Sequence, residues 1–320
     1  MAKKAFVYDG TQWVDIAQST TDLSNYANMT TTPISGFRNA IINGGMDIWQ
    51  RSTSSTTNGA YNSVDRWWMF YNAGTTTWSR ESTVVPTGFQ YALKATQATS
   101  TASMVIYQVI ETANATHYAG KTVTLSVYLA SSAAITVNPD VSYTTSVDSA
   151  VGATWTNITA TPASWSVPSG STYSRYTTTL TIPSTAKSLR VGFGPASIAA
   201  GVSYYITGVQ FEEGFIATPF ENRPIGIELS LCQRYYETGS YLAGYYWVNT
   251  WGAARSDNVT FKQPKRIAPD MTGTVMSGAG WAGTWSTSSV TTDKFNVANS
   301  STPNTGAFST AVSYVANAEL

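Results

Sequence analysis

One stretch decides the fold, and it reads Val209-Gln-Phe-Glu-Glu-Gly-Phe-Ile-Ala-Thr-Pro-Phe-Glu-Asn-Arg-Pro-Ile-Gly-Ile-Glu-Leu-Ser-Leu-Cys-Gln-Arg-Tyr-Tyr-Glu237. Its first residues predict a strand, because Val209 and Phe211 alternate with polar neighbours at the period of two that a half-buried strand requires. Gly214 breaks that pattern and begins an extended loop. The loop ends at Pro224, which suits the first turn of a helix because proline has no N–H to leave unbonded.

After Pro224 the residues Ile225, Leu229, Cys232 and Tyr236 recur at intervals of four, three and four. This spacing predicts one apolar stripe along a helix over residues 223–237. Because the stripe covers fewer than two heptads, two interpretations stay open: the helix ties two domains together, or copies of the chain meet along it. Cys232 is the single cysteine, so no internal disulfide is possible, and its position predicts a small buried hydrophobic residue.

Residues 37–222, before this helix, carry many short β segments separated by polar turns. In the clearest of them Val123, Leu125, Val127 and Leu129 share one face, and Thr122, Thr124, Ser126 and Tyr128 share the other. Burial of one face is typical of an antiparallel sheet packed on a second sheet. Further strands are expected over 103–111, 176–182, 189–193 and 202–211, and no helical period interrupts the run. We therefore expect a jelly-roll-like sandwich.

The two ends of the chain predict smaller β units. Residues 238–320 contain expected strands near 241–248, 258–262, 294–297 and 311–316, which suit a second, smaller β-sandwich; the Gly- and Trp-rich segment 276–285 is expected to form loops. Residues 1–36 predict a hairpin around Asp9-Gly10, followed by a linker. Because a lone hairpin buries little surface, we expect residues 1–36 to attach the chain to another protein or to copies of itself. The predicted fold class is all-β.

The composition excludes several function classes. Charged residues make up 11% of the chain, against about 25% in ordinary soluble proteins, and the formal net charge is zero. No basic field is present to hold nucleic acid, and no run of about 18 apolar residues predicts a membrane span. We therefore expect neither a nucleic-acid partner nor membrane insertion.

Residues for catalysis are scarce, so we expect no enzyme, no catalytic residue, no bound metal and no cofactor. His117 is the only histidine, it lies in a polar segment, and no Gly-x-Ser-x-Gly motif surrounds a serine. A glycosidase needs only two carboxylates, but Glu212 and Glu213, being adjacent on a strand, point to opposite faces. The other available acids are Asp65, Glu111 and Glu221. Asp140, Asp148 and Asp257 are expected in loops where oxygen atoms could bind Ca²⁺, but no 12-residue calcium loop is present.

Tryptophan and tyrosine side chains are the candidates for ligand contact, since sugar C–H faces stack on aromatic rings. Five of them fall in Gly-, Asn- and Ser-rich loops of the C-terminal part: Tyr246, Trp247, Trp251, Trp281 and Trp285. Loops on a rigid scaffold are where binding residues concentrate, although buried tryptophan also anchors small β cores. Trp49, Trp67 and Trp68 are expected to pack within the large sandwich.

Four blocks of sequence resemble tail-fibre-like structural proteins of tailed bacteriophages with a carbohydrate-binding-type sandwich. They are the opening stretch, Arg38-Asn-Ala-Ile-Ile-Asn-Gly-Gly-Met-Asp-Ile-Trp-Gln-Arg51, Asp65-Arg66-Trp67-Trp68 and Gly120-Lys-Thr-Val-Thr-Leu-Ser-Val-Tyr-Leu-Ala-Ser-Ser132. Ser52 stands where the resemblance leads us to expect glycine, which concerns only a local turn. The resemblance covers about residues 37–237 and identifies a component of the phage particle more specifically than an activity.

The resemblance implies a trimeric tail fibre that attaches to the particle through residues 1–36 and contacts glycans of the host surface. The alternative is a capsid or tail decoration protein, or a head-fibre adaptor, without receptor binding. A glycan hydrolase is the third and least favoured function. Under the first two, the expected partners are copies of the chain and other proteins of the phage particle.

Overall fold

The structure, a computed structural model, describes residues 6–8, 13–15, 37–245, 255–271, 275–279, 285–299 and 308–320. The chain divides into two compact units, Met1–Arg38 and Asn39–Leu320. In the first unit β1 (Phe6–Tyr8) pairs antiparallel with β2 (Trp13–Asp15), so that Tyr8 lies opposite Trp13. This pairing confirms the predicted hairpin.

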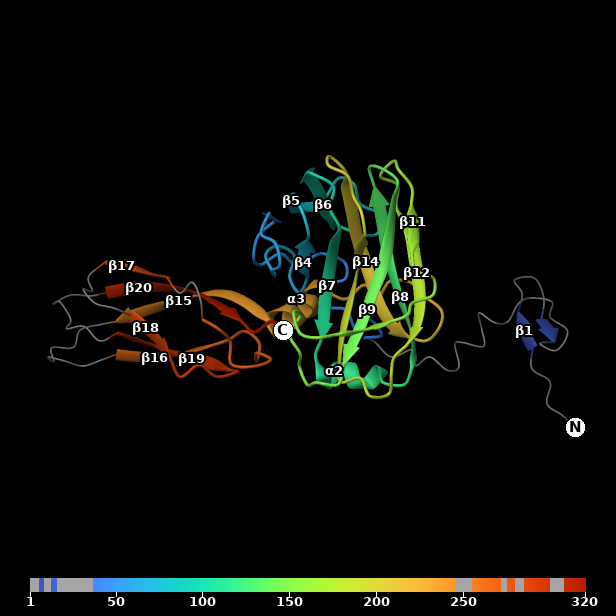
Figure 1. The fold of residues 1–320 in the computed structure, drawn as a ribbon. Coiled ribbons are helices and arrows are strands. Elements are labelled where there is room, and N and C mark those ends of the chain that lie inside the picture. Colours follow the sequence, from blue (N-terminus) through green and yellow to red (C-terminus); the bar gives the residue numbers. More distant parts are fainter. Residues whose placement is uncertain are drawn as a thin grey trace, which may run out of the picture. The chain divides into compact units, whose positions relative to one another are not determined.

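The second unit contains a sandwich of two antiparallel sheets (Figure 1). The first sheet has the strand order β10–β9–β13–β7–β4, and the second has the order β12–β8–β14–β6–β5–β3. The first sheet comprises β4 (Trp68–Tyr71), β7 (Met104–Ile110), β9 (Ile135–Thr144), β10 (Thr156–Ile158) and β13 (Ser188–Pro195), with β11 (Trp165–Val167) paired to β9. The second comprises β3 (Ser54–Ser55), β5 (Thr75–Glu81), β6 (Ala92–Thr99), β8 (Thr122–Ser131), β12 (Ser174–Thr181) and β14 (Ser203–Glu213).

The order of the strands along the chain confirms the predicted fold class. From β6 to β9, and again from β12 to β14, successive strands alternate between the two sheets. This alternation is the connectivity of a jelly roll. All five segments expected as strands before the helix coincide with β7, β8, β12, β13 and β14. Between β7 and β8 the chain forms only two short helical turns, α2 (Thr112–Ala115) and η2 (Thr116–Tyr118).

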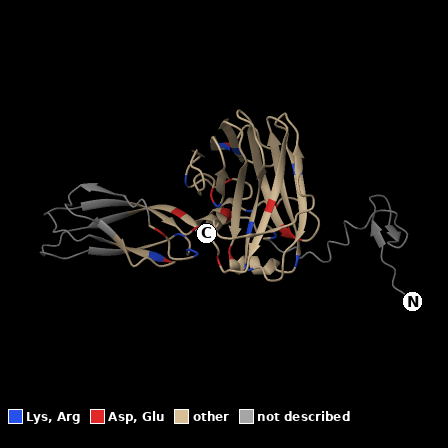
Figure 2. Ribbon diagram, viewed as in Figure 1, with Lys and Arg blue, Asp and Glu red and all other residues tan. Residues whose placement is uncertain are grey.

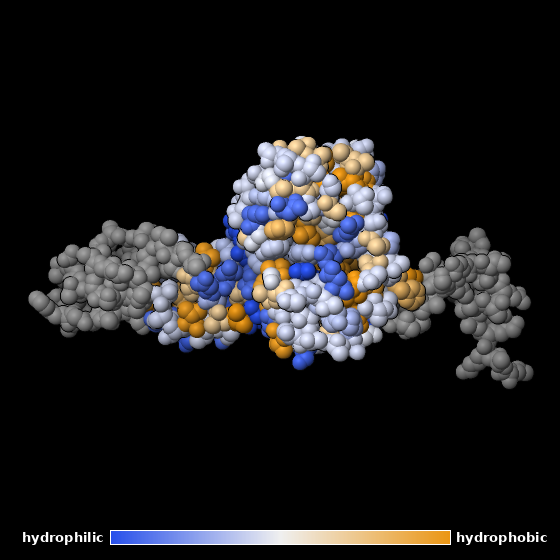
Figure 3. All heavy atoms as spheres, viewed as in Figure 1, coloured by the Kyte–Doolittle hydropathy of each residue, from blue (hydrophilic) through white to orange (hydrophobic). Residues whose placement is uncertain are grey.

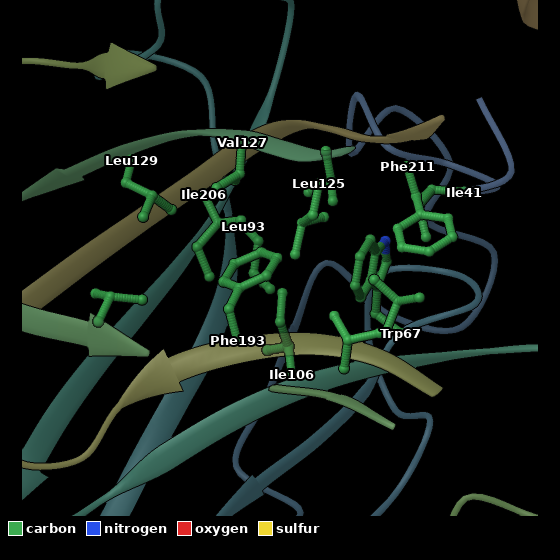
Figure 4. Packing of buried hydrophobic residues seen from close by; sticks show 14 of the residues in the cluster. Ile41, Trp67, Leu93, Ile106, Leu125, Val127, Leu129, Phe193, Ile206 and Phe211 are labelled. Atoms are coloured by element: carbon green, nitrogen blue, oxygen red, sulfur yellow. The ribbon is translucent and has the colours of Figure 1, made fainter. Parts of the chain in front are cut away.

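The core lies between the two sheets (Figure 4). Val123, Leu125, Val127 and Leu129 are all fully buried on the inner face of β8, as the alternating pattern predicted. Trp67 is also fully buried, and its ring meets that of Phe193 edge-on at 6.4 Å. Burial of this apolar surface is the main stabilising contribution to the fold.

The outer face of β8 is more buried than the sequence predicted. Thr124 and Ser126 are 1% and 0% exposed, although they lie on the polar face of the strand. The loop after β14 covers them: the Thr124 hydroxyl donates to the Gly214 carbonyl at 2.8 Å, and Arg175 bridges the Ser126 hydroxyl and the Thr218 carbonyl. The expectation of one-sided burial is therefore wrong for this strand, because the chain folds back over its own sheet.

Helix α3 (Ile225–Gln233) begins after Pro224, whose carbonyl accepts hydrogen bonds from the amides of Ile227 and Glu228. It is shorter than the expected 223–237. Tyr236 opens strand β15 (Tyr236–Tyr245) opposite Asn317, so placing it on the helix was wrong. Tyr235 is buried beneath the Arg66 guanidinium, 3.5 Å from its ring centroid, and this contact fixes the chain where the helix ends.

The C-terminal part contains two three-stranded sheets. Their orders are β15–β20–β17 and β16–β19–β18, with β16 (Arg255–Thr260), β17 (Val275–Ala279), β18 (Trp285–Ser288), β19 (Lys294–Asn299) and β20 (Phe308–Asn317). They share a small core that includes Phe261, Phe295 and Tyr314, as expected of a second, smaller sandwich. The segment expected to form loops, 276–285, is partly strand, because Met276–Ala279 pair with β20.

The last residues of the chain are bound to the large sandwich. Glu319 forms ion pairs with Arg66 and, at 2.8 Å, with Arg51, all of them largely buried. The Tyr61 hydroxyl donates to the carbonyl of Leu320 at 3.0 Å. Leu320 also packs in a cluster with Val109 and residues around α3. We call this set of contacts the C-terminal joint.

Within the described part of the chain, no helix has the length and apolar character needed to cross a membrane.

Candidate functional site

The outer face of the sheet β9–β13–β7–β4 carries the candidate site. Side chains alternate along a strand, and Val191 and Phe193 of β13 are fully buried in the core. Arg190, Gly192 and Gly194 therefore face outward on the same strand. Two outward glycines at the centre of a sheet leave a strip without side chains of its own, over which neighbouring side chains can lie flat, and we call this strip the trough.

One residue from each of four neighbouring strands forms a row across this trough. Gly192 pairs with Asp140 of β9 on one side and with Tyr107 of β7 on the other, and Tyr107 in turn pairs with Trp68 of β4. We call Asp140, Gly192, Tyr107 and Trp68 the sheet-face row. Facing positions in adjacent strands lie within about 4.5–5.5 Å, so the row forms one continuous surface.

Gly192 lets the Tyr107 side chain reach across β13. A Cβ atom at position 192 would lie 2.3 Å from Cδ1 of Tyr107 and 2.3 Å from the carbonyl oxygen of Ile106. With glycine there, the Tyr107 hydroxyl donates a hydrogen bond to Oδ2 of Asp140. Burial and this hydrogen bond raise the pKa of Tyr107, so it remains a donor at neutral pH. Oδ1 of Asp140 is buried and has no hydrogen-bond partner among the described residues.

Aromatic rings continue the row onto β4. The rings of Trp68 and Phe70 are stacked, with centroids 5.7 Å apart and planes inclined by 6°. Trp68 also lies 6.0 Å from the ring of Tyr107, and Phe70 is 38% exposed. Three aromatic side chains thus lie along one face of the sheet, and the one nearest to β9, Tyr107, is bonded to the Asp140 carboxylate. Aromatic rings of this kind can stack on the C–H faces of a sugar.

Arg190 closes one end of the trough. Its guanidinium carbon lies 4.2 Å from the ring centroid of Tyr107 and 5.4 Å from that of Trp155. Its Nε donates to the Ser142 hydroxyl, and its Nη1 donates to the carbonyl of Val151, each at 3.2 Å. The positive charge is therefore held against aromatic faces and neutral acceptors.

The outer face of the opposite sheet is covered by the chain itself. Phe89 packs against Tyr128 and Phe220, with ring centroids 5.3 and 5.0 Å apart. Glu212 there accepts three hydrogen bonds, from Gln210 and from the backbone and hydroxyl of Thr218. The face with the sheet-face row differs in that its aromatic rings lie on neighbouring strands of one sheet. Charged residues are sparse along the strands (Figure 2), and the visible face mixes hydrophobic and hydrophilic residues (Figure 3).

Four of the five predicted glycan contacts, Tyr246, Trp247, Trp251 and Trp281, lie outside the described residues. For the fifth, Trp285, the structure describes the backbone, which pairs with Asn299 at the start of β18. Their role as ligand contacts stays a prediction.

The four residues of the predicted helix stripe do not share one face. Cys232 is fully buried, which confirms it as a small core residue, and Tyr236 is 8% exposed on β15. Leu229 is half-buried, and Ile225 is 60% exposed. The buried side of α3 includes Glu228, whose carboxylate accepts a hydrogen bond from the Asn43 amide and lies 3.4 Å from Arg223. A buried ion pair in place of apolar residues explains why the stripe was misassigned.

The acids considered for glycoside hydrolysis all have partners within the chain. Asp65 is fully buried and accepts two hydrogen bonds from Gln50, Glu111 pairs with Arg234, and Glu221 accepts from the Asn39 amide. Glu212 is buried and Glu213 is exposed, as their adjacent positions predicted. His117 is exposed, on η2.

In the described part of the chain no group of three or more His, Cys, Asp or Glu residues could hold a metal ion. Asp140 and Asp257 lie in strands β9 and β16, not in the loops expected for calcium ligands.

Sequence reasoning missed the sheet-face row, because it assigned Trp68 to packing with Trp67. Two signals were present. Trp68 and Phe70 are two residues apart on one strand, as are Gly192 and Gly194, so each pair shares a face. No local signal joins the two pairs, since strand pairing brings them together across more than 100 residues of sequence.

Comparison with known proteins gives structural similarity only. No protein-family model and no curated protein matches the chain. Among solved structures, the enzymatically active domain of tailspike protein 4 of bacteriophage CBA120 is similar at a TM-score of 0.38 and 15% identity, over 56% of this chain and 22% of that one. This chain therefore spans about a fifth of the tailspike domain.

Two carbohydrate-binding modules are similar along nearly their whole lengths. TmCBM61, solved with β-1,4-galactotriose, has a TM-score of 0.35 and 9% identity over 56% of this chain and 100% of its own. The C-terminal family 22 module of Clostridium thermocellum Xyn10B has a TM-score of 0.34 and 15% identity over 52% of this chain and 94% of its own.

Proposed function

We propose that this chain is a non-enzymatic structural protein of a tailed-phage particle, a tail fibre, and that its large sandwich contacts neutral glycans of the host surface. The sheet-face row carries the proposal for glycan contact. Trp68 and Phe70 offer stacked ring surface, of which Phe70 is 38% exposed, and Tyr107, held by its hydrogen bond to Asp140, continues this surface across the sheet. The sequence blocks that resemble phage tail-fibre-like proteins support the proposal that the chain is part of a phage particle.

The charges at the row favour a neutral sugar over a charged one. The Arg190 guanidinium is held by Ser142, Val151 and two aromatic rings, so its position is fixed within the face of the sheet. Asp140 would repel an acidic sugar at the other side of the trough. A neutral pyranose would stack its C–H face on the exposed aromatic rings.

The proposed role in binding does not require catalysis. Three of the acids named as glycosidase candidates are buried, namely Asp65, Glu111 and Glu212. Hydrogen bonds or an ion pair hold each of them in the fold. Weak glycan contacts become useful when many copies act together, because a second contact on the same surface is effectively intramolecular. We therefore propose host attachment by avidity.

Trimer formation is the second part of the proposal. Helix α3 exposes Ile225 and Ile227 at 60% and 40%, while the next residue, Glu228, is buried. We propose that three copies meet along this exposed side, and that residues 1–36 attach the trimer to other proteins of the particle. Replacing both isoleucines with aspartate should reduce the mass measured by light scattering to that of a monomer, whereas Phe215→Asp, at an exposed apolar residue outside the helix, serves as the control.

Binding of fluorescently labelled full chain to intact host cells tests the glycan proposal. We expect Trp68→Ala to abolish most binding and a Trp251→Ala, Trp281→Ala double variant to retain it. The reverse outcome would move the contact to the predicted C-terminal loops. If the unmodified chain does not bind cells, the proposal of host attachment fails, and the chain is a decoration or adaptor protein.

A further inference from the structure

Arg266 is a side chain of the C-terminal part that reaches the large sandwich. Its Nε donates to the carbonyl of Ala318 at 3.1 Å, and its Nη2 donates to that of Glu319 at 3.2 Å. Its Nη1 lies 3.6 Å from Oδ2 of Asp148, in the turn after β9. The Arg266 side chain is 7% exposed, so this bridge is shielded from solvent on the arginine side.

Asp148 begins a segment that folds on itself. Its Oδ1 accepts a hydrogen bond from the Thr112 amide at 2.8 Å, and its backbone has a positive φ of 44°. The indole Nε1 of Trp155 donates to the carbonyls of Ala150 and Val151. We call residues 148–155 the Asp148–Trp155 segment.

This segment holds Arg190 at the end of the sheet-face row. The Val151 carbonyl accepts from Arg190, and the Trp155 ring lies under the same guanidinium. Arg190 in turn covers the ring of Tyr107, whose hydroxyl is bonded to Asp140. A contiguous set of contacts therefore runs from Arg266 to the row.

A second set of contacts supports the same connection. Val151 and Trp155 pack against the cluster that contains Leu320, Tyr235, Cys232 and Val109. Val109 is also the strand partner of Arg190. The C-terminal joint and the wall of the trough thus share one apolar cluster.

We propose that Arg266 is a positioning residue for the sheet-face row: it orders the Asp148–Trp155 segment, which sets the position of Arg190. The effect of Arg266 on glycan binding rests on the proposed glycan function. The ordering of the Asp148–Trp155 segment by Arg266 can be tested without any glycan. If ordering of the segment favours glycan binding, then glycan binding must stabilise the docked C-terminal part to the same degree, because coupling between two sites is reciprocal.

Hydrogen exchange of the full chain without ligand tests the positioning directly. Arg266→Met keeps the apolar stem and removes the donors. Lys262→Met is the matched control, since the Lys262 side chain is exposed and its ammonium donates to the Thr238 carbonyl within its own part. We expect amides of the Asp148–Trp155 segment, including Ala153, to exchange about tenfold faster in Arg266→Met and unchanged in Lys262→Met. Equal exchange in both variants would overturn the proposal.

A second variant guards against general unfolding of Arg266→Met. Asp148→Asn removes the charge that faces Arg266 but keeps an oxygen for the Thr112 amide. Faster exchange confined to the segment supports the proposal, and unchanged exchange overturns it.

Glycan titrations then separate the two proposals. With neutral host polysaccharide as the probe, we expect Arg266→Met to weaken binding about fivefold to tenfold. If the unmodified chain binds no polysaccharide, the glycan function fails, while the exchange data still decide whether Arg266 orders the segment.

Discussion

Tyr107 and Asp140 are joined by a hydrogen bond that passes over Gly192, the residue that pairs with both of them. The bond links β7 to β9 across the strand between them, which only a glycine at that position allows. It fixes the orientation of a carboxylate and an aromatic ring on an open sheet face. Such preorganisation lowers the entropic cost of binding a ligand there.

Gly192→Ala should destabilise the sandwich by about 1–3 kcal/mol, because the new methyl group would overlap the Ile106 carbonyl and the Tyr107 ring. Urea unfolding measures this loss. Gly152→Ala is the control, since nothing lies within 4 Å of a Cβ built there. Equal stability of the two variants would show that Tyr107 does not lie over Gly192.

The adjacent residues Trp67 and Trp68 should respond differently to truncation. Trp67 is fully buried and its indole donates to the Asn43 carbonyl, so Trp67→Ala should cost about 3–5 kcal/mol. Trp68 lies on the outer face, so Trp68→Ala should lower the free energy of unfolding much less in the same urea experiment. A larger loss at Trp68 would place it in the core and remove it from the candidate site.

The ion pairs of Glu319 should show strong non-additivity. Glu319→Gln or Arg66→Met alone leaves a buried charge without its partner, at a cost of about 3–5 kcal/mol. The double variant should cost clearly less than the sum, as measured by a double-mutant cycle. Glu213→Gln, in an exposed pair with Lys121, should cost less than about 1 kcal/mol. Additive losses for Arg66 and Glu319 would mean that the joint does not form in solution.

Stability should fall as the pH rises from about 4 to 6. Burial raises the pKa of Asp65 to about 6, and burial together with Glu228 raises the pKa of Asp47 to about 6. The folded state then binds more protons than the unfolded state in this window, so raising the pH costs up to about 2–3 kcal/mol at Asp65. The cost at Asp47 is smaller, because this side chain is partly exposed and solvent screens its charge. Asp65→Asn should flatten the dependence of the urea midpoint on pH. An unchanged slope would contradict the assignment of this titration to Asp65.

The sequence predicted features that depend on local pattern. Alternation located β8 with Val123 to Leu129 on its inner face, and Pro224 marked the start of α3. It did not predict what covers a face: Ser126 is buried by a loop that returns after β14, and Glu228 is buried because Asn43 and Arg223 lie against it. These contacts join residues far apart in sequence. The spacing of apolar residues along the chain indicates only the structure of the segment in which they lie.

The candidate site was hidden for the same reason. Asp140, Gly192, Tyr107 and Trp68 come from four strands, and their meeting depends on strand order and register. A one-residue change of register would turn each side chain to the other face. The sequence could identify aromatic residues as ligand candidates, but it could not choose among them.

Calorimetric titration of neutral host-surface polysaccharide into the full chain tests the central claim most directly, with Trp68→Ala and Phe215→Ala as the paired variants. Phe215 is an aromatic residue that is 64% exposed and lies in the loop after β14, so its loss removes a comparable ring away from the site. The sheet-face account predicts that Trp68→Ala weakens binding about tenfold or more and that Phe215→Ala leaves it unchanged. Binding that is equally strong in all three proteins would contradict it.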